Sequence, residues 1–318
     1  MTGFRVDQLL EKGWSRLMNY DCAIVGGGPA GLNAALVLGR ARRSVALLDN
    51  SQPRNRVTHA SHGFITRDGI QPDEFRRIAY KEVLRYPTVR HWPVEVTEIQ
   101  RTDQGFLLFT STGGRVQARK IILAAGFKEV LPDIEGVSDF YGKSLFNCPF
   151  CDGWELRDQP LVVISDSPDV IHKVKLLYNW SRDLVVCTNG SNSLTAIQRQ
   201  QLISRGIRIV DTPVAAFFGR EGLLERVYFT NGTHIERTAG FIAPALQPNA
   251  RFSTVLSYQT EESGGIVTDE MGRTTAYGVY AAGDSAYVMP SQLIYAAASG
   301  SKAAIAVVAD LTEEDWQV

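Results

Sequence analysis

The sequence is short of cysteine, of net charge and of long apolar runs, and each shortage excludes a class of protein. Four cysteines among 318 residues are too few for a secreted disulfide framework. The net charge is −1, whereas proteins that bind phosphate backbones usually carry an excess of basic residues, so we expect no nucleic-acid partner. The chain has no run of about 18 uncharged apolar residues, and charges fall where a signal peptide needs an apolar core. We therefore expect a cytoplasmic protein.

The remaining composition indicates a globular protein of two domains. Hydrophobic residues make up 44% and charged residues 21% of the chain, which excludes a largely disordered polypeptide. A length of 318 residues predicts two domains at about 150 residues each. Apolar residues at helical spacing over 4–18 predict an amphipathic helix, so that residues 1–18 form an N-terminal helical extension.

The chain repeats one plan, a strand followed by a helix and a second strand. Two such units imply an α/β protein with two parallel-sheet domains. The first unit is predicted at strand 22–25, helix 32–40 and strand 44–48, and the second at strand 161–164, helix 168–179 and strand 184–188. Further predicted elements are a helix at 72–84, strands at 93–99, 105–111, 116–124 and 278–282, and a closing helix at 292–310.

The hexapeptide at residues 26–31 fits the dinucleotide-binding pattern G-x-G-x-x-G between a strand and a helix. Gly26 permits a tight turn, Gly28 lets the backbone approach a pyrophosphate, and Gly31 lets the helix pack on the strand. Asp49 ends the second strand, where an acid holds a ribose hydroxyl. FAD and NAD satisfy this pattern equally, and a glycine-rich turn without ligand is the alternative. The expected cofactor-binding residues are Gly26, Gly28, Pro29, Ala30, Gly31 and Asp49.

The segment Ala281 to Asp284 follows a predicted strand near the other end of the chain. Together with the glycine-rich turn, this segment makes the sequence resemble the low-molecular-weight thioredoxin reductases. The stretches Ile24 to Gly31, Ile121 to Gly126 and Val279 to Asp284 carry the resemblance. It implies two dinucleotide-binding, Rossmann-like three-layer domains with the second inserted into the first. The FAD-binding domain would comprise 19–130 and 246–318, and the inserted domain 131–245. The resemblance also implies a homodimer.

The resemblance assigns further residues to the flavin. Asp284 would contact the ribityl–phosphate region, and Gln292 and Leu293 would lie against the isoalloxazine ring. The full set that it adds to the cofactor-binding residues is Asn55, His62, Gly126, Gly283, Asp284, Gln292 and Leu293.

The C-x-x-C motif formed by Cys148 and Cys151 is the strongest chemical feature of the chain. A structural zinc site needs four ligands, and the other two cysteines stand alone, so we expect no metal. A buried inert pair is the other alternative, but both thiols stand at a predicted helix start, where a thiolate is stabilised. The resemblance implies that Cys151 sits beside the flavin, that Cys148 exchanges with the partner disulfide, and that Asp152 shuttles the proton.

The second strand–helix–strand unit departs from the thioredoxin reductases. Ser165 and Ser167 replace two glycines, and β-branched Val170 stands where Gly or Ala is needed. Asp166 and Asp169 add negative charge where a pyrophosphate would rest, at about 1 kcal/mol or more for each close pair. The next strand ends without the arginines that grip a 2′-phosphate. The sequence therefore predicts no NADPH binding, and the domain either keeps its fold without this ligand or binds another one.

Several atypical relatives match these departures better. The stretch 49–73, with Asn55, His59 and His62, is similar to fungal and bacterial oxidases that close disulfides in dithiol natural products. Those oxidases often carry histidine after the second cysteine, where this chain has Asp152. The chain also resembles cyanobacterial diflavin-linked disulfide oxidoreductases, which hold a second FAD, and ferredoxin-dependent flavin thioredoxin reductases. Either His59 or His62 would assist thiol deprotonation, although loop histidines are more often solvated.

The last residues pose a separate hypothesis, in which Trp316 stacks on a flavin face. An unstructured tail is the alternative. Together the residues predict an FAD-dependent thiol–disulfide oxidoreductase without NADPH, whose partner is a thioredoxin-like protein or small dithiol, with ferredoxin as a further electron carrier. An NADPH-dependent thioredoxin-disulfide reductase and a non-enzymatic flavin redox sensor are the alternatives.

Overall fold

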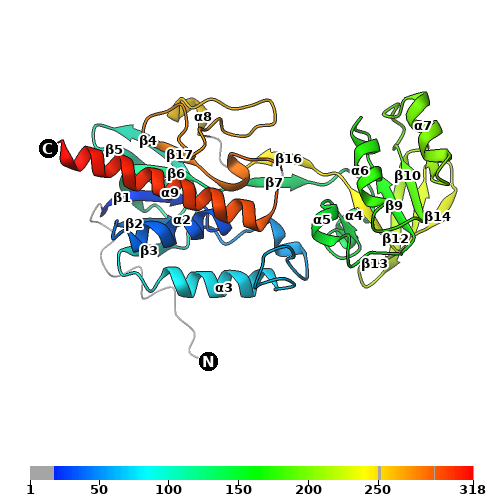
Figure 1. The fold of residues 1–318 in the computed structure, drawn as a ribbon, viewed down its shortest axis with the longest axis horizontal. Helices are drawn as coiled ribbons and strands as arrows, with labels where there is room; N and C mark the ends of the chain where they lie inside the picture. Colours follow the sequence, from blue (N-terminus) through cyan, green and yellow to red (C-terminus); the bar gives the residue numbers. More distant parts are fainter. Residues whose placement is uncertain (1–17, 250–251, 290, 318) are drawn as a thin grey trace. The chain divides into compact units, whose positions relative to one another are not determined.

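The chain folds into two compact units, which the computed structural model describes over residues 18–249, 252–289 and 291–317. Unit 1 comprises Met1–Pro53, Asp73–Lys128 and Pro248–Val318, and unit 2 comprises Arg54–Pro72 and Glu129–Gln247. The chain passes between the units through β7 (Phe127–Val130) and β16 (Ala245–Pro248), which pair as a two-stranded sheet (Figure 1). The predicted α/β class with a parallel sheet in each unit is confirmed.

Unit 1 is built on the first predicted strand–helix–strand unit. The strand β1 (Met18–Val25) is followed by α2 (Pro29–Arg40) and β2 (Val45–Leu48), and β1 pairs β2 in parallel from Cys22 to Val25. These strand residues are apolar and buried on both faces, as is usual for parallel sheets covered on two sides.

The sheet of unit 1 has seven strands in the order β3-β2-β1-β6-β5-β4, and β17 pairs β6. Strands β4 and β5 run antiparallel, whereas β17 is parallel to β6. The elements of this unit are completed by α3 (Pro72–Val83), β3 (Val89–Trp92), β4 (Val96–Thr102), β5 (Gly105–Thr110), β6 (Arg115–Leu123), α8 (Ser253–Leu256), β17 (Val279–Ala281), η2 (Gly283–Ser285) and α9 (Leu293–Trp316).

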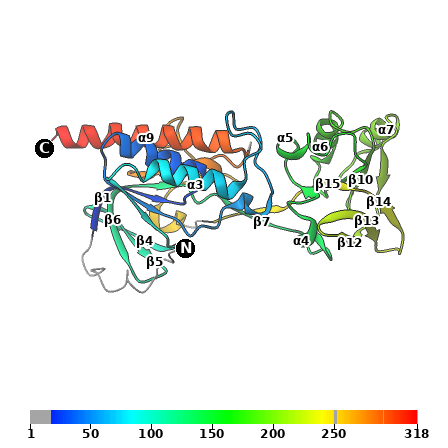
Figure 2. The same ribbon diagram turned by 90° about the horizontal axis from the view of Figure 1, so that it is seen from below.

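Two apolar cores cover the two faces of this sheet. Cys22, Ile24 and Ile122 pack against α2, α3 and α9 on one face, and the alternate residues Ala23 and Ile121 pack toward β4, β5 and α8 on the other. Figure 2 shows the helices on one side and the β4–β5 hairpin on the other. The period of two along each strand thus produces the three predicted layers.

Helix α9 packs closely on α2 because small residues line the contact. A Cβ added at Gly300 would lie 2.0 Å from the carbonyl oxygen of Ala30, and Ala303, Ala304 and Ala306 are buried. Among the described residues α9 alone is long and apolar enough to cross a membrane, which is weak support for a span because buried core helices share these properties. Its buried small residues fit a core helix.

Unit 2 contains the second strand–helix–strand unit in a five-stranded parallel sheet of order β11-β10-β9-β15-β8, together with a three-stranded antiparallel sheet β12-β13-β14. Its elements are η1 (Arg54–Val57), α4 (Val137–Phe140), β8 (Leu145–Phe146), α5 (Pro149–Asp152), β9 (Leu161–Ile164), α6 (Val170–Leu177), β10 (Leu184–Cys187), α7 (Ala196–Ile203), β11 (Arg208–Val210), β12 (Val214–Arg220), β13 (Leu223–Phe229), β14 (His234–Glu236) and β15 (Ala239–Ile242).

The structure differs from the sequence-based expectations at three places. Met18 begins strand β1 and does not end a helix, while the rest of the predicted extension lies outside the described residues. The segment Arg54–Pro72 groups with unit 2, although the sequence analysis assigned it to the first domain. Helix α9 runs to Trp316, six residues beyond the predicted end, so the alternative of an unstructured tail is wrong.

Candidate functional site

The turn before α2 leaves room for an anion. No side chain of the described residues caps this helix, and its first turn carries no acidic residue. A Cβ added at Gly28 would meet no described atom within 4 Å. Because the exposed amides and dipole of a helix N-terminus attract negative charge, these residues fit the pyrophosphate of FAD. FAD would supply the two-electron acceptor and donor for the cysteine pair.

The two outer glycines of the turn are required for packing. Gly26 has a φ of +110°, a conformation open to glycine, and its added Cβ would lie 2.4 Å from the carbonyl oxygen of Ala124. A Cβ at Gly31 would lie 1.9 Å from the carbonyl oxygen of Gly26. Both places match the predicted roles of tight turn and close helix–strand contact.

Asp49 lies after β2 and is 6% exposed. One of its carboxylate oxygens accepts from the Gly27 amide at 3.0 Å, and the other accepts from Arg76 at 2.9 Å and the Tyr80 hydroxyl at 2.7 Å. Burial and the neighbouring Asp49 carboxylate raise the pKa of Tyr80, so its phenol stays protonated as the donor. Arg76 and Tyr80 therefore fix this carboxylate toward the glycine turn.

Sequence analysis missed Arg76 and Tyr80. They are one helical turn apart on α3, and their i, i+4 spacing puts them on one face. That face meets Asp49 only through the packing of α3 on unit 1, which no local pattern encodes.

The other cofactor-binding residues predicted in unit 1 lie together. A Cβ at Gly126 would lie 3.8 Å from the Cβ of Asp284, and a Cβ at Gly283 would lie 2.8 Å from that of Ala30. The Gly283 amide donates to the Ser299 hydroxyl of α9 at 2.7 Å. Gln292 is the residue before α9, and Leu293 is its first residue. The structure thus gathers the ends of β6 and β17 with the first turns of α2 and α9.

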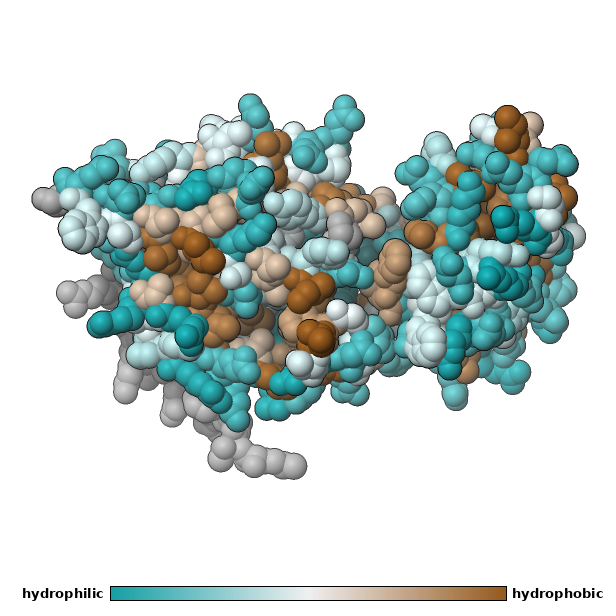
Figure 3. Space-filling view, in the orientation of Figure 1, coloured by the Kyte–Doolittle hydropathy of each residue, from teal (hydrophilic) through white to brown (hydrophobic). Residues whose placement is uncertain are grey.

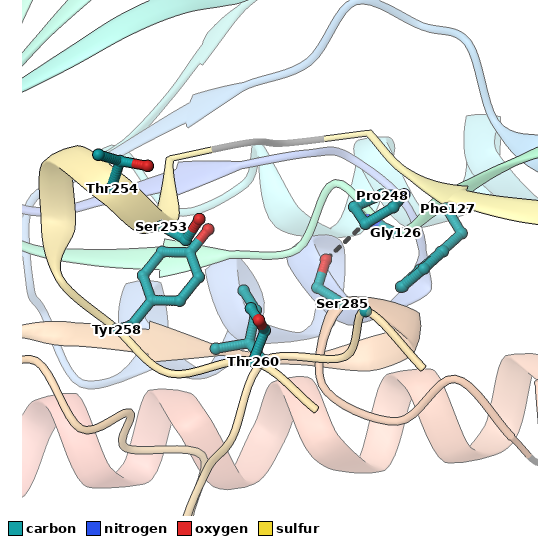
Figure 4. A pocket seen from close by; sticks show the side chains of 10 residues that line it. Gly126, Phe127, Pro248, Ser253, Thr254, Tyr258, Thr260 and Ser285 are labelled. Carbon is teal, nitrogen blue, oxygen red and sulfur yellow. Dashed lines mark hydrogen bonds between the residues drawn. The ribbon is translucent and has the colours of Figure 1, made fainter. Parts of the chain in front are cut away.

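A pocket of about 360 Å³ adjoins this group in unit 1. Its hydroxyl-bearing residues include Ser253, Tyr258 and Ser285, and Ser285 accepts a hydrogen bond from the Gly126 amide at 2.8 Å (Figure 4). The pocket lies beyond the carboxyl end of β6, where ligands of open α/β sheets bind.

In unit 2, Cys148 and Cys151 form a disulfide with their Cα atoms 5.3 Å apart. Both cysteines are partly exposed. The free cysteines Cys22 and Cys187 are fully buried, and burial raises the pKa of Cys187 to about 12. The reactive sulfur chemistry therefore belongs to the C-x-x-C pair. Within the described part of the chain, no group of three or more His, Cys, Asp or Glu residues is placed to hold a metal ion.

The helix predicted after Cys148 is a single turn. Helix α5 spans four residues with Cys148 as its N-cap, so its dipole gives a thiolate less support than a long helix would. The stronger electrostatic feature is Asp152. Burial, followed by the negative charge of Glu155, raises its pKa to about 7, against an opposing influence of His62. A carboxyl group near that value can accept and return a proton at neutral pH.

Two residues assigned to the flavin, Asn55 and His62, belong to unit 2 with the disulfide. The Asn55 amide donates to the Ser61 hydroxyl at 3.2 Å, and His62 faces Glu155. Their contact with a flavin stays a prediction. Glu155 was missed by sequence analysis, since its importance depends on the loop that brings His62 to it.

Trp316 is the last residue of α9 and is 85% exposed. Leu293 lies at the other end of this 24-residue helix, about 35 Å away at the rise of an α-helix. Trp316 and Leu293 therefore cannot both contact the same isoalloxazine ring within one chain, and the two predictions exclude each other.

A dinucleotide-binding turn in one unit and a C-x-x-C disulfide with a shielded carboxyl group in the other define a flavin disulfide oxidoreductase of the thioredoxin reductase-like class. The model of the family "Pyridine nucleotide-disulphide oxidoreductase" matches residues 20–165 and 169–300. The chain belongs to this family, and its enzyme class is confirmed.

The chain is similar over nearly its whole length to several known proteins. The thioredoxin reductase aclD of Aspergillus oryzae is 31% identical, over 93% of this chain and 98% of that protein. The crystal structure of TrxB from Bacillus anthracis is 45% identical with a TM-score of 0.90, over 93% of this chain and 99% of that one. An oxidoreductase from Agrobacterium tumefaciens is 34% identical with a TM-score of 0.87, at the same coverage.

Proposed function

We propose that this flavin disulfide oxidoreductase exchanges electrons between FAD and a thiol substrate through Cys148 and Cys151, and that NADPH is not its reductant. The observation that carries the second half of the proposal is the turn between β9 and α6 in unit 2. There the Ser167 amide donates to the Ser165 hydroxyl at 3.2 Å, and the Asp169 amide donates to the Ser167 hydroxyl at 3.3 Å. These amides are therefore already engaged at the position where a pyrophosphate would need them.

The side chains around this turn also oppose a dinucleotide. Val170 is 1% exposed, packed in the core where the pattern needs Gly or Ala. Asp166 and Asp169 bring negative charge to the same turn. In unit 1, by contrast, Gly26, Gly28 and Gly31 occupy the three glycine positions of the pattern, and the turn carries no acid. The two strand–turn–helix units thus share a fold, but only the turn of unit 1 has the glycines of the pattern and lacks acidic side chains.

The position for a 2′-phosphate at the end of β10 is also occupied by internal contacts. Thr188 donates to Asp211 at 2.8 Å, and Arg199 binds the same carboxylate through two hydrogen bonds of 2.8 and 2.9 Å. The Arg199 hydrogen bonds lower the pKa of Asp211, which keeps it ionised. Arg199 is therefore neutralised by a partner within the protein.

Anaerobic mixing tests the proposal. FAD-loaded protein is mixed separately with NADPH and with dithiothreitol, and flavin absorbance is followed. We expect bleaching by dithiothreitol and none by NADPH within the turnover time. Rapid bleaching by NADPH would overturn the NADPH-independent proposal. Releasing and quantifying the flavin from the same sample gives FAD per chain, where a ratio near two supports a diflavin enzyme.

NADPH-dependent thioredoxin-disulfide reduction is the second candidate. What favours it is the naming of relatives such as aclD as thioredoxin reductases. A flavin redox sensor without turnover is the third, and multiple-turnover oxidation of a dithiol would exclude it.

The surface next to the disulfide favours a thioredoxin-like protein or an apolar dithiol as substrate. Phe150, between the two cysteines, is 61% exposed, and Trp154 is 65% exposed. Phe150 packs edge-on against Trp180, and the Arg157 guanidinium lies 4.2 Å from the centroid of the Trp154 ring. Exposed aromatic side chains held in place in this way are typical of binding surfaces. Ferredoxin stays a further candidate as electron carrier.

The proposed homodimer has a candidate face on unit 1. Hydrophobic side chains gather over the side where α9 and α2 lie (Figure 3), and Ile294, Tyr295 and Ile305 of α9 are exposed. Sedimentation equilibrium should give a dimer for the wild type and a monomer for Ile305→Glu. A monomeric wild type would contradict the proposal.

A further inference from the structure

The loop Arg54–Pro72 is built to hold one histidine against the redox-active helix turn. Ser61 and Ile70 form an isolated antiparallel bridge that closes the loop. Asp68 accepts from the Gly63 amide at 2.8 Å. Gly63 and Gly69, which lie between the two bridged residues, both have a φ of +77°, a conformation that favours glycine. The loop is thereby fixed by its own hydrogen bonds within unit 2.

The His62 ring lies between two carboxylates. Its Nε2 is 3.6 Å from Glu155, and its Nδ1 is 3.5 Å from Asp68. The side chain of His62 is 22% exposed, so the ring reaches solvent as well as the protein. Each ring nitrogen thus faces one carboxylate, and an imidazole can bind or release a proton at either nitrogen.

His62 reaches the redox-active turn beside Glu155, which lies 3.6 Å from its Nε2 and follows Asp152 by three residues. The charges that act on Asp152 come from Glu155, His62 and Glu129. Glu129 is itself held by the Tyr141 hydroxyl at 2.8 Å and by Arg54 at 3.6 Å. Asp152 is thus bordered by two acids and by one imidazole that can carry a proton.

Building on the proposed thiol–disulfide exchange, we propose that His62 is a positioning residue that relays protons between Asp152 and solvent, with Glu155 and Asp68 holding its ring. A substrate thiol attacks the Cys148 Sγ, a new S–S bond forms, and the electron pair of the Cys148–Cys151 bond stays on the Cys151 Sγ. The second substrate thiol then displaces the Cys148 Sγ and closes the substrate disulfide.

The exchange releases protons that must leave the site. Two electrons pass from the substrate to the two cysteines, and the two substrate thiols lose two protons. The two cysteines are left as thiolates, so both protons leave the site: Asp152 takes them one at a time, the neutral His62 ring accepts each at Nε2, and Nδ1, beside the exposed Asp68, releases it to water. In the opposite direction the same path delivers protons to the leaving thiols.

The neighbouring charges predict opposite shifts for two substitutions. His62 lowers the pKa of Asp152 and Glu155 raises it. His62→Gln should therefore move the ionisation that controls exchange to higher pH, whereas Glu155→Gln should move it to lower pH. If the loop had only a structural role, the two substitutions would not shift this ionisation in opposite directions.

The test follows anaerobic flavin bleaching of the FAD-loaded protein by dithiothreitol in a stopped-flow instrument, from about pH 6 to about pH 9. We expect His62→Gln to lower the bleaching rate by about tenfold to a hundredfold with unchanged FAD content. Added imidazole should restore part of the rate in His62→Ala. His234, an exposed histidine of β14 in the same unit, provides the matched control, and His234→Gln should behave as the wild type.

The outcomes separate the two proposals. If dithiothreitol fails to bleach the wild type, the proposed exchange function is wrong, and the proton relay falls with it. If the wild type reacts and His62→Gln retains its rate and pH profile, the relay alone is refuted. An equal loss in His234→Gln, or no rescue of His62→Ala by imidazole, would also refute the relay.

Discussion

Two glycine-to-alanine substitutions in one turn should separate cofactor binding from folding. Gly28 has extended backbone, with φ −75° and ψ −177°, which alanine adopts freely. Its added Cβ would enter open space, where we place the pyrophosphate. The added Cβ at Gly31 would instead lie 1.9 Å from a backbone oxygen. The same methyl group therefore meets a ligand in one variant and the protein itself in the other.

The expected magnitudes differ accordingly. In Gly28→Ala the methyl group should cost the phosphate at least one charge-assisted hydrogen bond, about 1.5–3 kcal/mol, which corresponds to FAD binding weaker by about tenfold to a hundredfold. Replacing a glycine N-cap should cost the helix less than about 1 kcal/mol. In Gly31→Ala the helix must shift, at about 1–3 kcal/mol, and the apoprotein should melt several degrees lower, at about 2–4 °C per kcal/mol.

The assay uses apoprotein from which FAD has been removed. Fluorescence titration with FAD gives the Kd, and calorimetry of the same apoprotein gives the Tm. We expect Gly28→Ala to change the Kd with little change in Tm, and Gly31→Ala to lower the Tm. Tight FAD binding by Gly28→Ala would refute the placement of the pyrophosphate, and an equally large loss of Tm in both variants would refute the packing argument.

Three further predictions concern the described side chains. The pKa of Asp152 is raised to about 7, so between about pH 4 and pH 7 the unfolded chain binds fewer protons than the folded protein, and stability falls as pH rises. Asp152→Asn should therefore raise the free energy of unfolding by on the order of 3 kcal/mol at pH 8 and hardly change it at pH 4. Denaturant titrations that give equal effects at both pH values would contradict this. Trp154→Ala should raise the KM for an apolar dithiol severalfold at unchanged kcat, whereas Ile197→Ala, at another exposed apolar residue of unit 2, should leave the KM unchanged. The same KM in both variants would refute the proposed binding surface. Glu314→Gln should lower the free energy of unfolding by about 3 kcal/mol, because it leaves the buried Lys120 without its carboxylate partner. Trp316→Ala should leave both the Tm and the flavin absorbance unchanged if the isoalloxazine ring lies at the start of α9.

Strongly patterned segments of the fold were predictable from the sequence. The glycine turn at 26–31 and the apolar strands on either side of it specify β1, α2 and β2 because strand burial and helix start are both local properties. The disulfide of Cys148 and Cys151 follows from their spacing. These features depend on residues close in sequence, where periodicity and turn chemistry decide the structure.

The features that escaped prediction depend on long-range packing. Nothing local to residues 54–72 indicates that they join unit 2, because the partner of Arg54, Glu129, lies 75 residues further along the chain, and that of His62, Glu155, lies 93 residues further. The extension of α9 to Trp316 is stabilised by Glu314 and Asp315, which bind Arg119 of β6. The cationic partners of these acids, Arg43, Arg119 and Lys120, are far away in the sequence, so no pattern within the tail predicts them.

The central proposal is that the Cys148–Cys151 pair exchanges electrons with FAD. The most direct measurement is the absorbance of the FAD-loaded Cys148→Ser variant, in which Cys151 is a free thiol, as pH is raised through thiol ionisation. We predict a broad long-wavelength absorbance from a thiolate against the flavin, absent from the matched Cys151→Ser variant. An identical flavin spectrum in both variants at every pH would contradict the account.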